Sequence, residues 1–335
     1  MNTPAETPSS SESNEPEMPE ADSPPRRFSS IRWLFPILLL AALVTVFSFT
    51  SSRFLTLNNF FIVLQQTVVL LVVAVGMTFV IISGSIDLSV GSMTALAAMV
   101  AAASSSSLSV AAIIPAILIG LVAGLLNGVL FAVGKIPSFM VTLGTLVAHR
   151  GIVLYCMRGA PISITDINYL DLYNGRQLGV PNSALIAAVI VILAILLFSN
   201  LVYGREVRAI GGRERVAILT GIRVDRVKII TFTLLGGLCG LAGVLQSARA
   251  FGATAQLGDG LELDVIAAVV VGGTPLTGGI GSIQGTILGA FITTVLSNGM
   301  NMLGVDAYLQ NLVRGIVLIT AVFVTIDRSK IGIIK

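Results

Sequence analysis

Long apolar runs follow one another along nearly the whole of this sequence, and they limit its possible folds more than any other feature. Only 11% of the residues are charged and 55% are hydrophobic, whereas a soluble domain has about 25% charged residues. A water-soluble fold cannot bury so much apolar surface, so membrane lipid must surround most of the chain. The runs are continuous rather than alternating and aromatic residues are few, which argues against a β-barrel. We therefore expect an all-α integral membrane protein.

The apolar runs predict about ten transmembrane helices. Their expected limits are 33–50, 60–83, 87–103, 108–133, 136–156, 183–202, 227–248, 262–276, 281–303 and 306–326. With ten spans, most Lys and Arg residues fall on the side where the chain begins, and the positive-inside rule makes that side the cytoplasm. Both termini are then cytoplasmic, and Arg150 and Arg314 remain inside spans.

The chain divides into a transmembrane domain with a short segment at each end. Residues 1–30 are rich in Ser, Pro and Glu, so we expect a disordered cytoplasmic tail. The transmembrane domain is predicted at 31–328, with its largest cytoplasmic loop at 203–227, and residues 329–335 form a cytoplasmic end.

Glycines suggest an internal repeat of five plus five helices. Gly120, Gly124 and Gly128 recur 161 residues later as Gly281, Gly285 and Gly289, and Gly76 recurs as Gly237. Transporters often contain such duplications. Glycines spaced by four residues also occur by chance in membrane helices that pack closely.

The segment between the second and third predicted spans contains a carboxylate among hydroxyl groups. Its candidate pathway residues are Ser85, Asp87 and Ser89. A charged Asp in a membrane costs about 2.5–3.5 kcal/mol, so Asp87 needs a partner, a water-filled cavity or an interfacial position. Asp87 either caps the third span through backbone N–H groups at Ser89 or Val90, or contacts a transported solute.

The loop at 203–227 is the longest polar segment on the expected cytoplasmic side. Gly211-Gly212 should interrupt it, and residues 213–219 should form a short helix closed by Gly221. Such a helix either docks a cytoplasmic partner or is a solvated loop that obeys the positive-inside rule. The candidate docking residues are Arg205, Arg208, Gly211, Gly212, Arg213, Glu214, Ala217 and Gly221.

The third polar segment is residues 262–281, in which a short apolar run has acidic residues at its start and a turn of Gly, Thr and Pro at its end. Short segments interrupted by glycine often line cavities in membrane proteins. Glu262 and Asp264 either cap this helix at its N-terminus or face the pathway. The further pathway candidates are Asn127, Gly272, Gly273 and Thr274. Asn127, together with Asn298 and Asn301, is also a candidate for hydrogen bonds between helices.

The sequence carries no motif for chemistry of its own. It has no phosphate-binding loop, no catalytic triad and no cluster suited to a metal, so we expect no catalytic residue, no bound cofactor and no enzymatic activity. Cys156 and Cys239 are expected to pack in the core, and His149 to be a helix residue with a local hydrogen bond. Acidic residues interleave the basic loop, so nucleic acid is not an expected partner.

These segments together resemble the permease subunits of ribose-type (carbohydrate uptake) ABC importers, in the branched-chain amino-acid and monosaccharide permease superfamily. The resemblance covers roughly residues 54–326. The motifs that carry it are 76–84 with 86–92, then 209–212 with Ala217 and 221–222, and finally 262–274 with 278–279 and 285–286. Ser85, Arg213 and Ile280 stand where this family usually has Gly, Asn and a basic residue.

The resemblance implies a type II ABC importer fold in a bacterial inner membrane. It implies a second permease copy, identical or paralogous, and a cytoplasmic ATPase that docks on the loop and uses ATP and Mg²⁺. It also implies a periplasmic or lipid-anchored solute-binding protein and a monosaccharide or similar small polar solute. Two other classes remain open from the residues alone: an ion-coupled secondary transporter, and a scaffold without transport.

Overall fold

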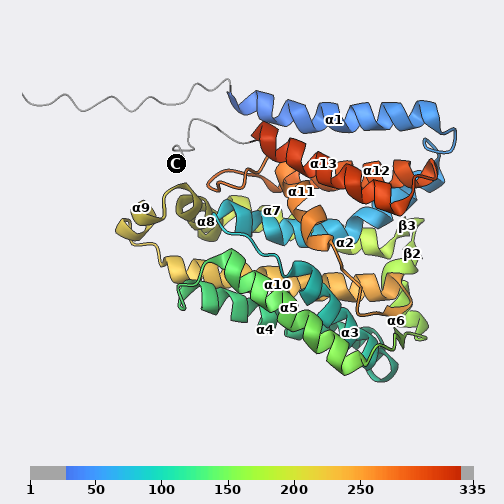
Figure 1. Cartoon of the computed structure of the whole chain (residues 1–335), viewed down its shortest axis with the longest axis horizontal. Coiled ribbons are helices and arrows are strands. Elements are labelled where there is room, and N and C mark those ends of the chain that lie inside the picture. The colour runs from blue at the N-terminus through green and yellow to red at the C-terminus, as the bar shows by residue number, and fades with distance from the viewer. Residues whose placement is uncertain (1–27, 326–335) are drawn as a thin grey trace, which may run out of the picture.

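The chain is a bundle of long helices (Figure 1). The computed structural model describes residues 28–325. In chain order the first helices are α1 (Phe28–Thr50), α2 (Leu57–Ile82), α3 (Val90–Leu108), the 3-10 helix η1 (Ser109–Ala112), α4 (Ile113–Ala132) and α5 (Ser138–Met157). Then come β1 (Ile162–Ser163), α6 (Ile167–Asn174), β2 (Arg176–Gln177), β3 (Val180–Pro181), α7 (Asn182–Asn200), α8 (Val202–Gly212) and α9 (Glu214–Leu219). The last elements are α10 (Val224–Arg249), β4 (Gly252–Ala253), α11 (Leu261–Val271), α12 (Ile283–Met302) and α13 (Ala307–Thr325).

The strands are two-residue pairs that tie connections together. β1 pairs with β4, and β2 pairs with β3, both antiparallel. They lie near α6, at the end of the bundle away from α8 and α9 (Figure 1).

The helices agree with a membrane protein, and five segments of the described residues are long and apolar enough to cross a bilayer. These are Leu57–Ile82, Val90–Ala132, Ser138–Met157, Asn182–Asn200 and Val224–Arg249. The second segment includes α3, η1 and α4, and α3 packs against α4. Shorter apolar helices lie at Leu34–Thr50 and Ala307–Phe323. The helical membrane fold is therefore confirmed, whereas the count of ten spans stays a prediction.

Some predicted boundaries and environments differ from the structure. α1 begins at Phe28, so the last three residues of the predicted tail are helical, while 1–27 and 329–335 lie outside the described residues. The run at 262–276 contains only α11, whose 11 residues extend about 16 Å, too short for a bilayer core of about 30 Å. Cys239 is buried as expected, but the prediction is wrong for Cys156, which is exposed near the end of α5.

The bundle is built around α2, which is buried on every side from Thr67 to Ile82. A helix that is apolar all round belongs in an interior, and α10, α11, α12 and α7 surround this one. α2 therefore joins one end of the molecule to the other through the core.

The most extensive helix contact is between α4 and α10, and glycines let the two backbones approach closely. A Cβ on Gly120 would overlap the backbone of Gly236, and one on Gly124 would overlap the backbone of Phe232. Small residues allow such close packing in membranes, where the hydrophobic effect does not hold helices together.

The glycines of the predicted repeat do not share one packing role. Gly120 and Gly124 approach α10, whereas Gly285 and Gly289 approach Gly272 and Ala268 at the end of α11. The spacing reflects close helix contacts in both halves, and the duplication itself stays a prediction.

Candidate functional site

The three polar segments singled out in the sequence meet at one end of the bundle. The N–H of Gly279 donates to the carbonyl of Ile82 at the end of α2, over 2.8 Å. A Cβ on Gly211, at the end of α8, would overlap both of these groups. Gly278 packs on Gly84 in the same way, and both have positive φ angles near 78° (+77° and +79°) that favour glycine. We call Gly84, Gly211, Gly212, Gly278 and Gly279 the glycine junction.

Four predicted pathway residues lie beside this junction. Ser85 is buried, and its N–H donates to the carbonyl of Val80. Gly272 packs on the backbone of Gly285, and Gly273 adopts a φ of +92°. Thr274 is fully buried, and its hydroxyl has no partner among the described residues. Gly272, Gly273 and Thr274 begin the turn between α11 and α12, whereas Ser85 lies between α2 and α3.

Asp87 is the centre of a fully buried hydrogen-bond network. Its Oδ1 accepts from the N–H of Ser89 (2.7 Å) and from the Ser89 hydroxyl (2.6 Å). Asn127 of α4 donates through Nδ2 to Asp87 Oδ2 (3.3 Å) and to Ser89 Oγ (2.9 Å). The predicted backbone partner Ser89 is confirmed, although the N-cap of α3 is Ser89 itself. The predicted role of Asn127 in linking helices is also confirmed.

Some residues of α8 and α9 pack against the bundle, and others are exposed. Arg208 lies 4.1 Å from the ring centroid of Phe198 and donates to its carbonyl, and Ala217 is buried. Glu214 pairs with Lys228 of α10 over 2.8 Å. Burial raises the pKa of Tyr203 to about 12, so its hydroxyl stays neutral and bonds Thr231 of α10. These contacts fix α8 and α9 to the bundle.

The outward side of α9 is apolar with basic neighbours. The predicted short helix is confirmed, and it is followed by Gly221 with a φ of +85°. The exposed fractions of Val216, Ile218 and Leu219 are 48%, 54% and 85%. The predicted docking residues exposed beside them are Arg205, Gly212, Arg213, Glu214 and Gly221. Sequence reasoning missed Ile218, although its helical spacing from Arg215 placed it on the surface.

A polar cavity of about 330 Å³ lies toward the opposite end of the bundle. The polar residues that α2, α10, α11 and α13 contribute, with the turn before α11, are Gln66, Gln246, Arg249, Asp259, Asp264 and Arg314. α12 adds Thr293, Thr294, Ser297 and Asn301. Val224 begins α10 next to α9, and Gln246 near its other end lines the cavity, so the two regions are about 30 Å apart along the helix.

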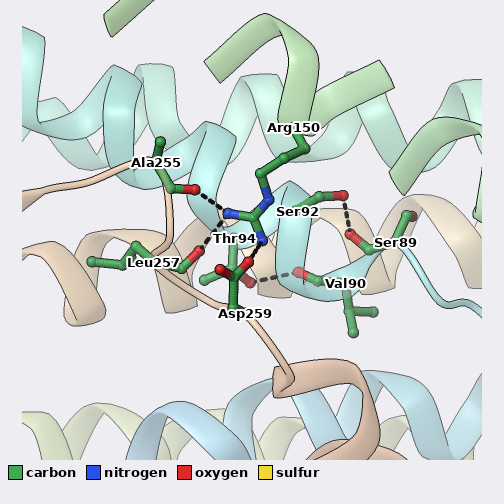
Figure 2. A network of polar contacts seen from close by, with 8 residues as sticks. All are labelled: Ser89, Val90, Ser92, Thr94, Arg150, Ala255, Leu257 and Asp259. Carbon is green, nitrogen blue, oxygen red and sulfur yellow. Dashed lines mark hydrogen bonds and ion pairs between the residues drawn. The ribbon is translucent and has the colours of Figure 1, made fainter. Parts of the chain in front are cut away.

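Two arginines hold the segments around this cavity, and sequence reasoning left both without a role. Arg150 of α5 donates to the carbonyls of Ala255 and Leu257 and pairs with Asp259 (Figure 2). Arg314 of α13 bonds Asp264 over 3.5 Å and Ser297 over 3.2 Å. An arginine inside an apolar span needs a partner. That rule identifies such residues as important but does not name their partners.

The structure separates the predicted pathway residues. Asp264 lines the cavity, whereas Asp87, Ser89 and Asn127 form the network near the glycine junction. Glu262 and Asp264 lie in the first turn of α11, where the prediction placed them, although the N-cap residue is Gly260. Glu262 also approaches Gly91 of α3. His149 is buried, and its Nδ1 has no partner among the described residues. No group of three or more potential metal ligands occurs within residues 28–325.

Gly211→Ala should destabilise the glycine junction, because the new methyl group overlaps backbone atoms that cannot rotate away. We expect a loss of about 1–3 kcal/mol, measured as a lower thermal unfolding temperature in detergent. Gly212→Ala is the matched control, since nothing lies within 4 Å of its Cβ position. Equal stability of the two variants would show that the junction tolerates a side chain.

Asp87→Ala should be more harmful than Asp87→Asn. The alanine removes the acceptor of the Ser89 N–H and hydroxyl and one of the two acceptors of Asn127 Nδ2, whereas asparagine keeps one carbonyl oxygen. We expect Asp87→Ala to cost about 1–3 kcal/mol for each buried donor that is left unpaired. Yield and thermal unfolding of both variants measure this, and an unaffected Asp87→Ala would contradict it.

The sequence matches a known family of transport proteins. Residues 59–322 match the family described as the permease component of the branched-chain amino acid transport system. The ribose import permease of Escherichia coli (strain K12) is 39% identical over 308 residues, covering 89% of this chain and 96% of that protein. The ribose import permease of Bacillus subtilis (strain 168) is 41% identical over 301 residues, covering 89% and 93%.

A xylose transport permease of Escherichia coli (strain K12) is 32% identical over 353 residues, covering 85% of this chain and 90% of that protein. No solved structure matches the chain with significance. The relatives are transport components rather than enzymes, as expected for this chain. This chain therefore belongs to the ribose-type permeases of the branched-chain amino acid transport family, which are multi-pass inner-membrane components of ABC importers.

Proposed function

We propose that this chain forms the translocation pathway for a monosaccharide or a similar small polar solute. The observation that carries this proposal is the arrangement along α2 and α10. A polar cavity lies toward one end of these helices, and the exposed apolar residues of α9 lie beyond the other. The relatives named for ribose and xylose support a sugar as the solute.

A separate cytoplasmic ATPase drives the transport by docking on α8 and α9. Val216, Ile218 and Leu219 offer it an apolar contact, and Arg205 and Arg213 offer charges at the rim. ATP and Mg²⁺ bind to that partner and not to this chain. Because α8 and α9 are fixed to α10 and to the glycine junction, their displacement reaches the helices that line the cavity.

The opposite end receives the solute from a periplasmic or lipid-anchored binding protein. In this orientation both termini, α8 and α9 are cytoplasmic, as the distribution of Lys and Arg indicates. A second permease copy, identical or paralogous, completes the assembly in the membrane. The exposed apolar side chains of α4, α5 and α7 are available to that copy and to lipid.

Uptake by proteoliposomes tests the function directly. We expect uptake of labelled D-ribose or D-xylose only when the chain, its ATPase, its binding protein and ATP are all present. Uptake by the chain alone, driven by a proton or sodium gradient, would instead support an ion-coupled transporter.

The double change Ile218→Glu and Leu219→Glu should abolish co-purification with the ATPase. Two charges replace apolar groups at the proposed contact, while both side chains are already exposed, so insertion and stability should not change. Leu178→Glu is the control, because Leu178 is fully exposed in the turn between β2 and β3 at the other end. Normal co-purification of the double variant would place the ATPase elsewhere.

A further inference from the structure

An apolar cavity of about 670 Å³ lies between α2, α4, α7 and α10. α7 packs against α2 but makes little contact with α10, so the cavity separates α7 from α10. Of the described residues that line it, Asn200 alone has a polar side chain, and it is the last residue of α7. Leu193, Leu196 and Leu234 line it with exposed fractions of 56%, 47% and 37%. The apolar cavity therefore opens on the outer surface of the bundle.

Two glycines of the predicted repeat, Gly76 of α2 and Gly237 of α10, both line the apolar cavity. A Cβ on Gly76 would lie 2.9 Å from the side chains of Leu235 and Leu238, and one on Gly237 would lie 2.9 Å from that of Leu121. Side chains at these positions would press on the leucines around the cavity and reduce its volume. Glycine instead lets another group approach the backbone closely. Both glycines therefore keep the apolar cavity open.

The side of α10 that lines the apolar cavity continues toward α9 and ends in two arginines. Spacings of three or four residues keep a set of positions on one side of a helix. The residues on this side are Leu241, Gly237, Leu234, Ile230, Arg226 and Arg223. Ile230 is 46% exposed, and both arginines are exposed and have no ion-pair partner within residues 28–325. An apolar surface strip thus ends in unpaired positive charge.

The length of this strip matches one leaflet of a bilayer. Arg226 and Leu241 are fifteen residues apart (241 − 226) on α10, which is about 22 Å along the helix. A bilayer with its headgroups is about 40–45 Å thick, so one leaflet takes roughly 20–22 Å. With Arg226 at the level of the headgroups, Leu241 lies near the middle of the bilayer. A lipid of the leaflet nearer α8 and α9 can therefore reach both ends of the strip.

We propose that the apolar cavity binds an acyl chain of an anionic glycerophospholipid, whose phosphate pairs with Arg223 and Arg226. Arginine binds phosphate through two parallel hydrogen bonds, and basic groups beside grooves between membrane helices bind anionic headgroups. The Ser199 hydroxyl donates to Oδ1 of Asn200, which leaves the Asn200 amide N–H groups for an ester carbonyl of the lipid. A second copy packed on this face by a two-fold axis would bring its own two arginines to the contact, which a lipid phosphate avoids.

Quenching of tryptophan fluorescence by lipids with brominated acyl chains tests this site in the full-length chain. Trp33→Phe removes the one tryptophan of the sequence, and Leu193→Trp then places a reporter on the cavity wall. Ile192→Trp is the matched control, because Ile192 is the next residue on α7, is 57% exposed and is not among the lining residues. Each protein is reconstituted in phosphatidylcholine liposomes with increasing fractions of brominated phosphatidylglycerol, which is anionic, or of brominated phosphatidylcholine.

The Leu193→Trp reporter should distinguish the two brominated lipids. We expect phosphatidylglycerol to bind with a relative constant about fivefold or more above that of phosphatidylcholine, because its net negative charge is attracted to the arginines. The Ile192→Trp reporter should show no preference, since ordinary lipid surrounds it. Leu196→Trp, which also lines the cavity, repeats the measurement if Leu193→Trp does not fold.

Changing the arginines tests the headgroup contact. Arg223→Gln together with Arg226→Gln should remove the preference at the Leu193→Trp reporter, while folding should not change because both side chains are exposed. Arg53→Gln together with Arg158→Gln is the matched control, because it removes the same net charge from exposed positions at the other end of the bundle. The preference should remain in that control.

Every result either supports the lipid site or overturns it. A preference at Leu193→Trp that requires Arg223 and Arg226 supports it. Equal quenching by the two lipids, or a preference that persists without these arginines, overturns it. Weaker quenching by both lipids at Leu193→Trp than at Ile192→Trp would show that protein, such as a second copy, covers the cavity, and would also overturn it. None of these results depends on which solute the chain transports.

Discussion

Lipid cannot satisfy a charge or a backbone polar group, and the arrangement of this bundle depends on that constraint. Three ionisable groups inside the bundle have a partner on a distant segment. Asp87 is bonded by Asn127 of α4, and Asp264 is paired with Arg314 of α13. Arg150 of α5 holds the turn before α11. These contacts connect helices that apolar packing alone would not hold in register, because lipid is as apolar as the side chains it replaces.

The glycine junction is the second feature that connects distant segments of the bundle. Backbone groups of α2, α8 and the turn after α11 meet there without any side chain between them. Interfaces packed so closely do not deform gradually, so a movement of α8 must displace both neighbours or break the contact. The junction therefore offers a mechanical route from the proposed ATPase contact to α11, whose other end carries Asp264 at the cavity. The short length of α11, with glycines on both sides, suits a segment that moves as one unit.

Sequence reasoning located most elements but not their inner and outer faces. The long apolar runs became helices, and the predicted short helix after Gly212 is present. Arg208 and Ala217 were predicted among the docking residues, yet both turn inward, because Arg208 stacks on Phe198 and Ala217 lies on the buried side of α9. Cys156 was predicted in the core and is exposed. Helical periodicity is weak evidence in a membrane, since lipid-facing and buried positions are equally apolar.

The sequence by itself determined the helical membrane fold, the family and the position of the short helix α9. These follow from composition, run length and local motifs, which act over neighbouring residues. Only the tertiary structure brought residues 84, 211 and 279 together, and only it joined Arg314 to Asp264 beside Gln246. Such contacts depend on how each helix is rotated about its own axis and on which helices are neighbours. Close packing between distant segments sets both, and no local pattern in the chain records them.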